Sequence, residues 1–500
     1  MVNGQRAKTR KKGAAASSGA GASAELWLRE ARRWGWLDFL GAYDQQLAML
    51  RSTTSQTSAL HLAVAGAPTS AFGLYAGDDL ITGWPVFHDP IEGYRAKNVG
   101  SPNCVSIGDV GFGKSSFSKT WITMRNLTLG RRVVIVDKKM QTAGDTDGEH
   151  EGEYAALARG LGVEPIRFTG EAGGLRINPL DPVITGSDRL TASHTDLLKA
   201  ILEEVIGESL SAEERKALRV ARDAAVTRAH EAGRIATIHD VTLYLLQPDE
   251  EIVGQQLGHY GVEEYAAWGR RVGFALEECI EGELAGLIDG ETSEEIRVNA
   301  GLTVFDISAL PDSGPAVPVV MAIINTWLRS TLLKQKSAVP TFFVVEEGWH
   351  LVEGSFAKVS QQNTKKSRGL ALSTVTNYQH LSDVPADSPA IATIKEAGTI
   401  ALFRQARRED AEACQRLFGL PPSSIDLMMN LEQGCCLMKI GNKPAVLMRA
   451  SRSSIEARLA DTDGSLLSQA RVDLQGDEFS AGAHEDPTDL VLAAPGGEEA

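Results

Sequence analysis

The sequence lacks the features that would indicate a secreted or membrane-spanning protein. It has only 5 cysteines in 500 residues, an odd number, and no two of them are spaced as C-x-x-C. This excludes a disulfide framework and a cysteine-based zinc site, and it favours a reducing cytoplasm. No apolar run reaches the ~18 residues that a membrane span needs. The basic start, MVNGQRAKTRKKG, is followed by no apolar segment, so we expect no secretory signal and no transmembrane segment.

Positive charge is also in deficit, because the formal net charge is −15. This argues against a generic nucleic-acid coat protein, although a chain with this net charge can still have a local basic surface. Hydrophobic residues make up 43% of the chain, which is enough for a large core. Composition predicts a disordered basic tail over 1–24, an N-terminal helical segment over 25–84 and a disordered acidic tail over 464–500.

One glycine-rich stretch carries most of the functional information. The segment GDVGFGKS, from Gly108 to Ser115, fits the pattern G-x-x-x-x-G-K-[ST], and it stands between a short apolar strand and a helical run over Phe117–Leu129. Glycines let backbone N–H groups approach a phosphate, and the helix that follows adds its N-terminal dipole. We therefore predict a nucleotide site with Lys114 on the β- and γ-phosphates. Its expected lining is Gly108, Asp109, Val110, Gly111, Phe112, Gly113, Lys114, Ser115 and Ser116.

Alternation of apolar strands and helices predicts the fold class. Arg131–Asp137, RRVVIVD, is a continuous β-branched run, which is typical of strands buried on both faces of a parallel sheet. The segment 138–152 is polar and is expected to be a loop. Residues 187–295 are acidic and helical, with two capping motifs, and we interpret them as a helical insertion. The expected fold is α/β, a RecA-like P-loop NTPase with a mostly parallel sheet whose core spans 85–186 and 296–463.

A second strand supplies acidic groups. In TFFVVEEGW, the apolar run that begins at Thr341 ends in Glu346 and Glu347. A phosphate loop requires an acidic partner strand to hold the Mg²⁺ shell and to orient water. We expect Ser115 and Glu346 to hold Mg²⁺ and Glu347 to orient the attacking water. His350, next to these acids, has no second ligand at metal spacing and is not expected to bind a metal.

Three further predictions concern polar residues of later segments. If the strand 370–376 lies between the phosphate-loop strand and the Glu346 strand, Thr376 or Asn377 would sense the γ-phosphate. Arg368 and Arg404 are candidates for a charge-stabilising finger that reaches into a neighbouring subunit's site. Each arginine is equally well interpreted as a surface or ion-paired residue.

The order of these motifs carries a family resemblance. GDVGFGKS, VVIVDKK, EGEYAALARGLG, GLRINPLDP, EEGWHLV and SRGLALSTVTNYQHLSDV follow one another in the chain. Over roughly residues 85–463 the sequence resembles the large ATPases of conjugation and type IV secretion, in the HerA–FtsK branch of RecA-like motors. The family usually has Asp-Glu where this chain has Glu346-Glu347, so the first carboxylate is extended by one methylene.

The resemblance implies a hexameric ATPase that uses ATP and Mg²⁺ to energise substrate transfer. It implies catalytic roles for Lys114, Ser115 and Glu347, with Arg368 or Arg404 as the finger. Expected partners are membrane components of the secretion apparatus, at the cytoplasmic inner face of the membrane. A DNA translocase or helicase of the same branch, with DNA as partner, is one alternative. A scaffold that binds ATP with little turnover is the other.

Overall fold

The computed structural model describes residues 73–460, apart from 143–149, 172, 186–190, 249, 258–259, 298–300, 336, 349–366 and 386–387. Both predicted tails lie outside the described residues. The same holds for the part of the N-terminal segment before residue 73, and for Trp349 and His350.

Eleven of the described strands form one sheet, in the order β2-β1-β13-β12-β11-β3-β10-β9-β4-β8-β7. From β11 to β7 all neighbours are parallel, whereas β12, β13, β1 and β2 continue the sheet as antiparallel strands. The predicted RecA-like α/β fold with a mostly parallel sheet is confirmed. The strands of this sheet are β1 (Leu74–Asp79), β2 (Pro85–His88), β3 (Cys104–Ile107), β4 (Arg132–Asp137), β7 (Ile166–Arg167), β8 (Leu302–Asp306), β9 (Thr341–Val345), β10 (Leu372–Tyr378), β11 (Thr399–Leu402), β12 (Cys435–Ile440) and β13 (Val446–Ala450).

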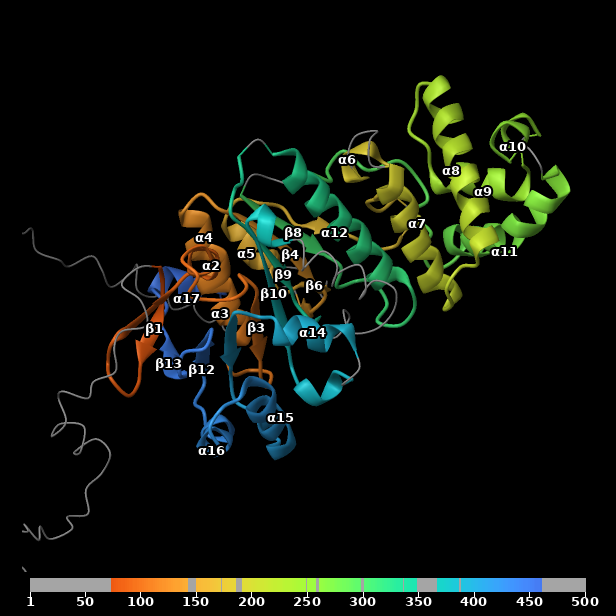
Figure 1. The fold of residues 1–500 in the computed structure, drawn as a ribbon. Coiled ribbons are helices and arrows are strands. Elements are labelled where there is room, and N and C mark those ends of the chain that lie inside the picture. Colours follow the sequence, from red (N-terminus) through yellow and green to blue (C-terminus); the bar gives the residue numbers. More distant parts are fainter. Residues whose placement is uncertain are drawn as a thin grey trace, which may run out of the picture. The chain divides into compact units, whose positions relative to one another are not determined.

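Helices cover both faces of this sheet (Figure 1). Those before residue 187 are α2 (Pro90–Arg95), α3 (Lys114–Phe117), the π-helix η4 (Ser118–Met124), α4 (Arg125–Thr128), α5 (Ala155–Gly160) and α6 (Pro182–Thr185). The next are α7 (Thr191–Ile206), α8 (Ala212–Glu231), α9 (Ile238–Leu246), α10 (Glu250–Leu257), α11 (Val262–Glu281) and α12 (Ala316–Lys334). The last are η7 (Ser367–Leu370), η8 (Leu381–Asp383), α14 (Pro389–Lys395), α15 (Arg408–Phe418), α16 (Ser423–Met429) and α17 (Ser454–Ala460).

Strand β4 shows why its sequence is apolar throughout. Val133 and Ile135 pack in the core on the face that carries the helix after the phosphate loop, with Phe117 and Trp121. Val134 and Val136 belong to the core on the opposite face. Alternate residues of a strand point to opposite faces, so a strand covered on both sides needs apolar residues at every position.

The predicted helical insertion corresponds to α7–α11, which lie beyond α12 in Figure 1. Its apolar residues join the same core as α12 and one face of the sheet, so these helices are packed onto the α/β core. Both predicted capping motifs are present. Ser211 and Glu214 form a reciprocal capping box on α8, and Thr237 and Asp240 form another on α9. These caps satisfy backbone N–H groups that the helix itself leaves unpaired.

Two local expectations were wrong. Leu74–Asp79 is strand β1, although it was assigned to the N-terminal helical segment, because it pairs with β13 and β2. The expected loop 138–152 contains a small antiparallel pair, β5 (Met140–Thr142) and β6 (His150–Gly152). The predicted helical run after the phosphate loop is present, and its middle part, Ser118–Met124, is π-helical.

One described helix, α12, is apolar and long enough to span a membrane, but 72% of its apolar window is buried within the protein. Val320, Ile323 and Trp327 pack in the core that α12 shares with the sheet. This is the environment of a central core helix, so the apolar composition of α12 is explained by packing.

Candidate nucleotide site

The phosphate loop begins where β3 ends, at the carboxyl edge of the parallel strands. Gly108, Gly111 and Gly113 have φ values of 152°, 82° and 99°, which side chains rarely tolerate. A Cβ on Gly108 would lie 2.7 Å from Cβ of Phe403. The glycines are therefore required by the backbone conformation and, at Gly108, also by close packing.

Lys114 folds back over this loop. Its Nζ donates to the carbonyl oxygen of Gly108, and to that of Asp109 at 2.9 Å. Burial lowers the pKa of Lys114 to about 8, although the nearby carboxylate of Glu346 acts in the opposite direction. The ammonium group is thus held over the loop, where a phosphate-binding lysine is placed, and it lines the cavity described below.

The residues that follow β11 and those that precede β12 make hydrogen bonds to the phosphate loop. Asp109 N–H donates to the carbonyl oxygen of Arg404 at 2.9 Å, and the Arg404 guanidinium lies 4.8 Å from the Phe112 ring centroid. Gln433 donates to the Gly111 carbonyl at 2.9 Å. Arg404 therefore packs on the phosphate loop of its own chain, and it does not line the cavity described below.

Glu346 stands at the end of β9, next to β10 in the sheet. Its Oε1 accepts hydrogen bonds from the Tyr154 hydroxyl and from Nδ2 of Asn377, the latter at 2.6 Å. Burial and the neighbouring Glu153 raise the pKa of Glu346 to about 7. Strand β10 does lie between β3 and β9, so the condition for Thr376 or Asn377 to lie near the γ-phosphate is met.

Glu347 follows in a left-handed conformation, with φ of 59°. Such a conformation costs about 1–3 kcal/mol in a non-glycine residue and is concentrated at functional sites. The turn directs the Glu347 carboxylate toward Gln379, whose Nε2 donates to it at 3.1 Å. Both side chains line the cavity.

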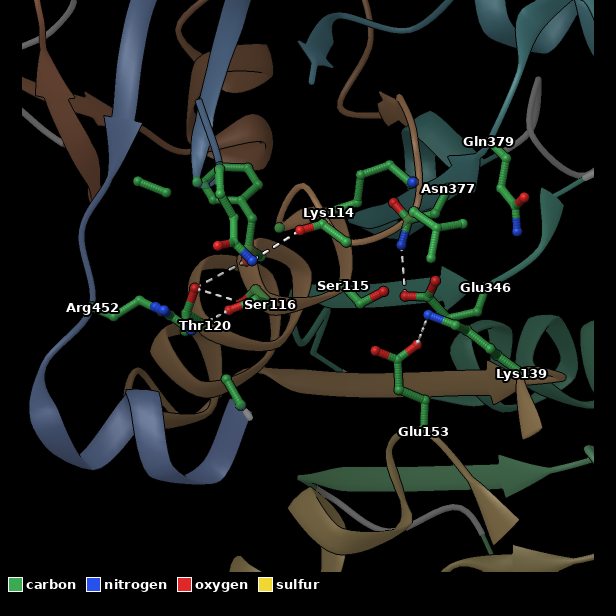
Figure 2. A pocket seen from close by; sticks show the side chains of 18 of the residues that line it. Lys114, Ser115, Ser116, Thr120, Lys139, Glu153, Glu346, Asn377, Gln379 and Arg452 are labelled. Atoms are coloured by element: carbon green, nitrogen blue, oxygen red, sulfur yellow. Dashed lines mark hydrogen bonds and ion pairs between the residues drawn. The ribbon is translucent and has the colours of Figure 1, made fainter. Parts of the chain in front are cut away.

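Glu153 forms a second carboxylate centre beneath Ser115. Lys119 and Lys139 lie 3.5 Å and 3.0 Å from its two oxygens. Burial raises the pKa of Glu153, but the two lysines and a hydrogen bond from Ser115 outweigh that effect, so its pKa lies below the usual value. Figure 2 shows Lys139, Glu153 and Glu346 converging on the space in front of Ser115.

These groups line a cavity of about 650 Å³, large enough for a nucleotide. Arg452 lies on the side of the cavity away from Glu346, where its Nη1 donates to the Ser116 hydroxyl at 2.8 Å (Figure 2). Asn377 lines the cavity with a buried Oδ1 that has no hydrogen-bond partner among the described residues, whereas Thr376, whose Oγ1 also lacks a partner, is not among the lining residues. Cationic donors, a hydroxyl beside carboxylates and unsatisfied polar atoms fit Mg²⁺ with a nucleoside triphosphate.

The structure brings together most of the residues predicted from sequence. Gly111, Gly113, Lys114, Ser115, Ser116, Glu346 and Glu347 all line the one cavity. Arg368 does not join them, because its backbone lies in η7, which precedes β10 at the opposite end from Asn377.

Residues of the site that were not predicted include Lys139, Glu153, Tyr154, Gln379 and Arg452. Lys139 and Glu153 stand in the segments VVIVDKK and EGEY, whose charged residues follow a buried strand or precede a helix. That position at a strand end was the available signal. Arg452 comes from the far end of the chain, and no local pattern marks it.

Comparisons with known proteins agree with this fold. A family model described as an AAA-like domain matches residues 86–442. Among solved structures, the chain is similar to VirB4 of Thermoanaerobacter pseudethanolicus, with 20% identity and a TM-score of 0.60, covering 78% of this chain and 100% of that chain. No curated protein sequence matches it.

The bacterial conjugative coupling protein TrwB is also similar, with 14% identity and a TM-score of 0.50. That match covers 77% of this chain and 90% of the TrwB chain. A structure of TrwB with the GTP analogue GDPNP matches equally well, over 77% and 91% of the two chains. At these identities the likeness establishes the fold, and the expected resemblance to conjugation and secretion ATPases is confirmed at that level. Because the family model spans most of its length, this chain belongs to the family of AAA-like domain proteins.

Proposed function

We propose that the protein binds and hydrolyses ATP with Mg²⁺ in the cavity at the carboxyl edge of the sheet. The observation that carries this proposal is that Lys114, Ser115 and Glu347, which come from different segments, line one cavity of nucleotide size. A folded phosphate loop alone would support only binding. Its combination with Glu347, which follows β9 with a strained backbone and lines the same cavity, supports hydrolysis.

In this proposal, different residues of the cavity bind the phosphates, hold the metal ion and orient the attacking water. Lys114 holds the β- and γ-phosphates, while Ser115 and Glu346 hold Mg²⁺ and its water ligands. Mg²⁺, when bound, neutralises charge on the phosphate oxygens. Glu347 accepts a hydrogen bond from the attacking water and orients it, and Gln379 fixes the Glu347 carboxylate. Asn377 keeps Glu346 in place and leaves its own Oδ1 for the nucleotide or its water shell.

The load of this motor is proposed to be a type IV secretion or conjugation apparatus. The support is the fold shared with VirB4 and with the conjugative coupling protein TrwB, over nearly the whole described chain. In this proposal the protein works as a homo-hexamer at the cytoplasmic face of the membrane, bound to membrane components of the apparatus. A ring would also supply a neighbouring subunit for the arginine finger.

A DNA translocase is the second candidate function, and one surface favours it. A hollow of about 1040 Å³ lies at the amino ends of β3 and β11. The nucleotide cavity lies at the opposite, carboxyl ends of the parallel strands. The lining of the hollow includes a single acidic residue, Glu396, and five basic residues, namely Arg95, Lys97, Lys395, Lys439 and Lys443. In a chain of net charge −15 this concentration of cations fits a phosphate backbone.

The deciding experiment is steady-state phosphate release by the full chain with Mg·ATP, with and without single- and double-stranded DNA. We expect Lys114→Ala to abolish turnover by preventing binding. We expect Glu347→Gln to lower turnover by about 100-fold or more while ATP still binds. Glu281→Gln, on the exposed end of α11, is the matched control and should behave as wild type.

Each outcome has a clear meaning. Turnover lost in both site variants and indifferent to DNA supports the secretion-type motor. Strong DNA stimulation, with affinity that falls steeply between about 50 and 200 mM salt, would favour the translocase. ATP binding without turnover in the wild-type protein would contradict both motor functions. It would leave the third alternative, a scaffold that binds ATP with little turnover, and the Glu346-Glu347 pair would then be a sign of lost activity.

A further inference from the structure

Lys139 lines the nucleotide cavity and has no role in the binding and hydrolysis proposed above. It stands two residues after β4, whose Val136 pairs with Val345 of β9, so Lys139 reaches the same edge as Glu346. Its Nζ lies 3.0 Å from Oε2 of Glu153. In Figure 2 the Lys139 ammonium lies between Glu153 and Glu346, in front of Ser115.

The backbone of Lys139 is fixed, whereas its side chain is not enclosed. Its N–H donates to Asp137 Oδ1 at 3.2 Å, and its carbonyl accepts from Glu153 N–H at 3.0 Å. The Lys139 side chain nevertheless retains 32% of its exposure, against 1% for Glu153. Movement of the ammonium group therefore requires only rotation about side-chain bonds, with no change in the backbone.

Glu153 would remain paired if Lys139 moved away. Lys119 is buried, lies 3.5 Å from Glu153 Oε1 and donates to the Glu153 carbonyl at 2.8 Å. A buried carboxylate that loses its only cationic partner is strongly destabilised, so a single counter-ion would stay bound to it. Because Glu153 has two lysines, the exposed one is available to a second anion.

A triphosphate brings such an anion to this place. Lys114 donates to carbonyl oxygens of the loop and reaches the β- and γ-phosphates from that side only. Glu153, Glu346 and Glu347 line the same cavity, and their negative charge adds to that of a γ-phosphate, so a cation beside Lys114 and Mg²⁺ favours a triphosphate there. A diphosphate ends short of these carboxylates and has no such requirement.

We propose that Lys139 exchanges its ion pair with Glu153 for the γ-phosphate and so makes the site select nucleoside triphosphates over diphosphates. This inference rests on the proposed nucleotide site and adds a binding residue to it. The exchange also links the presence of the γ-phosphate to Glu153 and to the β5–β6 pair that ends beside it. A lysine that stays locked on Glu153 would have a structural role only.

The test is equilibrium binding of ADP and of a non-hydrolysable ATP analogue, in Mg²⁺, to the full chain. Lys139→Met keeps the length of the side chain and removes its charge. We expect it to weaken the ATP analogue by about tenfold or more and ADP by less than about twofold, the difference being one charge-assisted contact. Lys139→Arg should recover part of the lost discrimination. Arg452→Met, at the opposite side of the cavity, is the contrast and should affect both ligands alike.

The controls separate this inference from the proposed function. Unchanged ADP binding by Lys139→Met shows that the variant is folded and that its phosphate loop is intact. If Lys139→Met binds both ligands as wild type does, or loses both to the same extent, the γ-phosphate role is overturned while the nucleotide site stands. If the wild-type protein binds neither ligand, the proposed function itself fails.

Discussion

At the scale of single residues, the buried His88 makes the stability of the fold depend on pH. His88 of β2 is 5% exposed, shares a 2.7 Å hydrogen bond with the Thr399 hydroxyl and stacks on Trp121. Burial lowers the pKa of His88 from 6.5 to about 4, with Asp89 opposing and Lys443 reinforcing the shift. His88 is therefore neutral in the folded protein over a range in which an unfolded chain would be protonated.

Acid should accordingly weaken the fold through His88. Between pH 6.5 and about 4 the unfolded state binds more protons than the folded state, so the stabilising contribution is complete above pH 6.5 and is lost as pH falls toward 4. By pH 5 the loss amounts to about 2 kcal/mol. Urea unfolding at about pH 7 and pH 5 gives the fall in the free energy of unfolding between the two pH values. In His88→Gln this fall should be smaller than in wild type by that amount. An identical pH dependence in the variant would contradict the assignment.

At the scale of elements, the insertion α7–α11 depends on correctly capped helices packed into a shared core. In α8 the Ser211 hydroxyl accepts from Glu214 N–H at 3.1 Å, and the Glu214 carboxylate accepts from Ser211 N–H at 2.8 Å. The helix then buries an apolar face that includes Leu218 and Ala221. The cap fixes where the helix begins, and packing supplies most of its stability.

Removal of this cap should therefore have a limited cost. We expect Ser211→Ala to lower the free energy of unfolding by about 1 kcal/mol, since one N–H of the first turn loses its acceptor. Ser211→Asn keeps a capping oxygen and should stay close to wild type. Urea unfolding measures the change, and amide exchange should locate it in the first turn of α8. A loss as large for the Asn variant as for the Ala variant would show that capping is not the cause.

At the scale of the whole molecule, the sheet separates the two candidate finger arginines. Arg404 follows β11 and packs on Phe112 of its own phosphate loop. Arg368 lies in η7, before the 7-residue strand β10. A strand of that length spans about 20 Å, so the Arg368 backbone is well removed from the cavity of its own chain. If Arg368 contributes to hydrolysis, it does so in a neighbouring subunit.

Mixing of inactive subunits tests this prediction. Arg368→Ala leaves an intact phosphate loop without a finger, and Lys114→Ala leaves a finger without a functional loop. In rings assembled from equal amounts, we expect turnover to recover to about a quarter of wild type, because each intact loop has an arginine-bearing neighbour half of the time. The same mixture with Arg404→Ala should not recover, since Arg404 serves its own loop. Recovery with Arg404→Ala would assign the finger to that residue.

Local sequence patterns were sufficient for several parts of the fold. The apolar run over 131–137 indicated a strand buried on both faces, and the structure has β4 there. The glycine pattern from Gly108 to Gly113 indicated a phosphate loop, because those φ values are accessible to few other residues. The Ser211 and Thr237 capping boxes were recognisable because their partners are three residues apart. In each case the physical cause lies within a few residues.

Other features depend on partners distant in sequence, and these only the tertiary structure decided. Leu74–Asp79 is a strand because β13 pairs with it, more than 300 residues later. Glu346 meets Tyr154 and Asn377, and Lys139 is placed against Glu153, because parallel β4, β9 and β10 bring their carboxyl ends to one edge. The sequence alone thus determined buried central strands such as β4 and the phosphate loop, whose conformations follow from local sterics and apolar patterning. The charge network around the γ-phosphate position required the folded sheet, because its members are neighbours only in space.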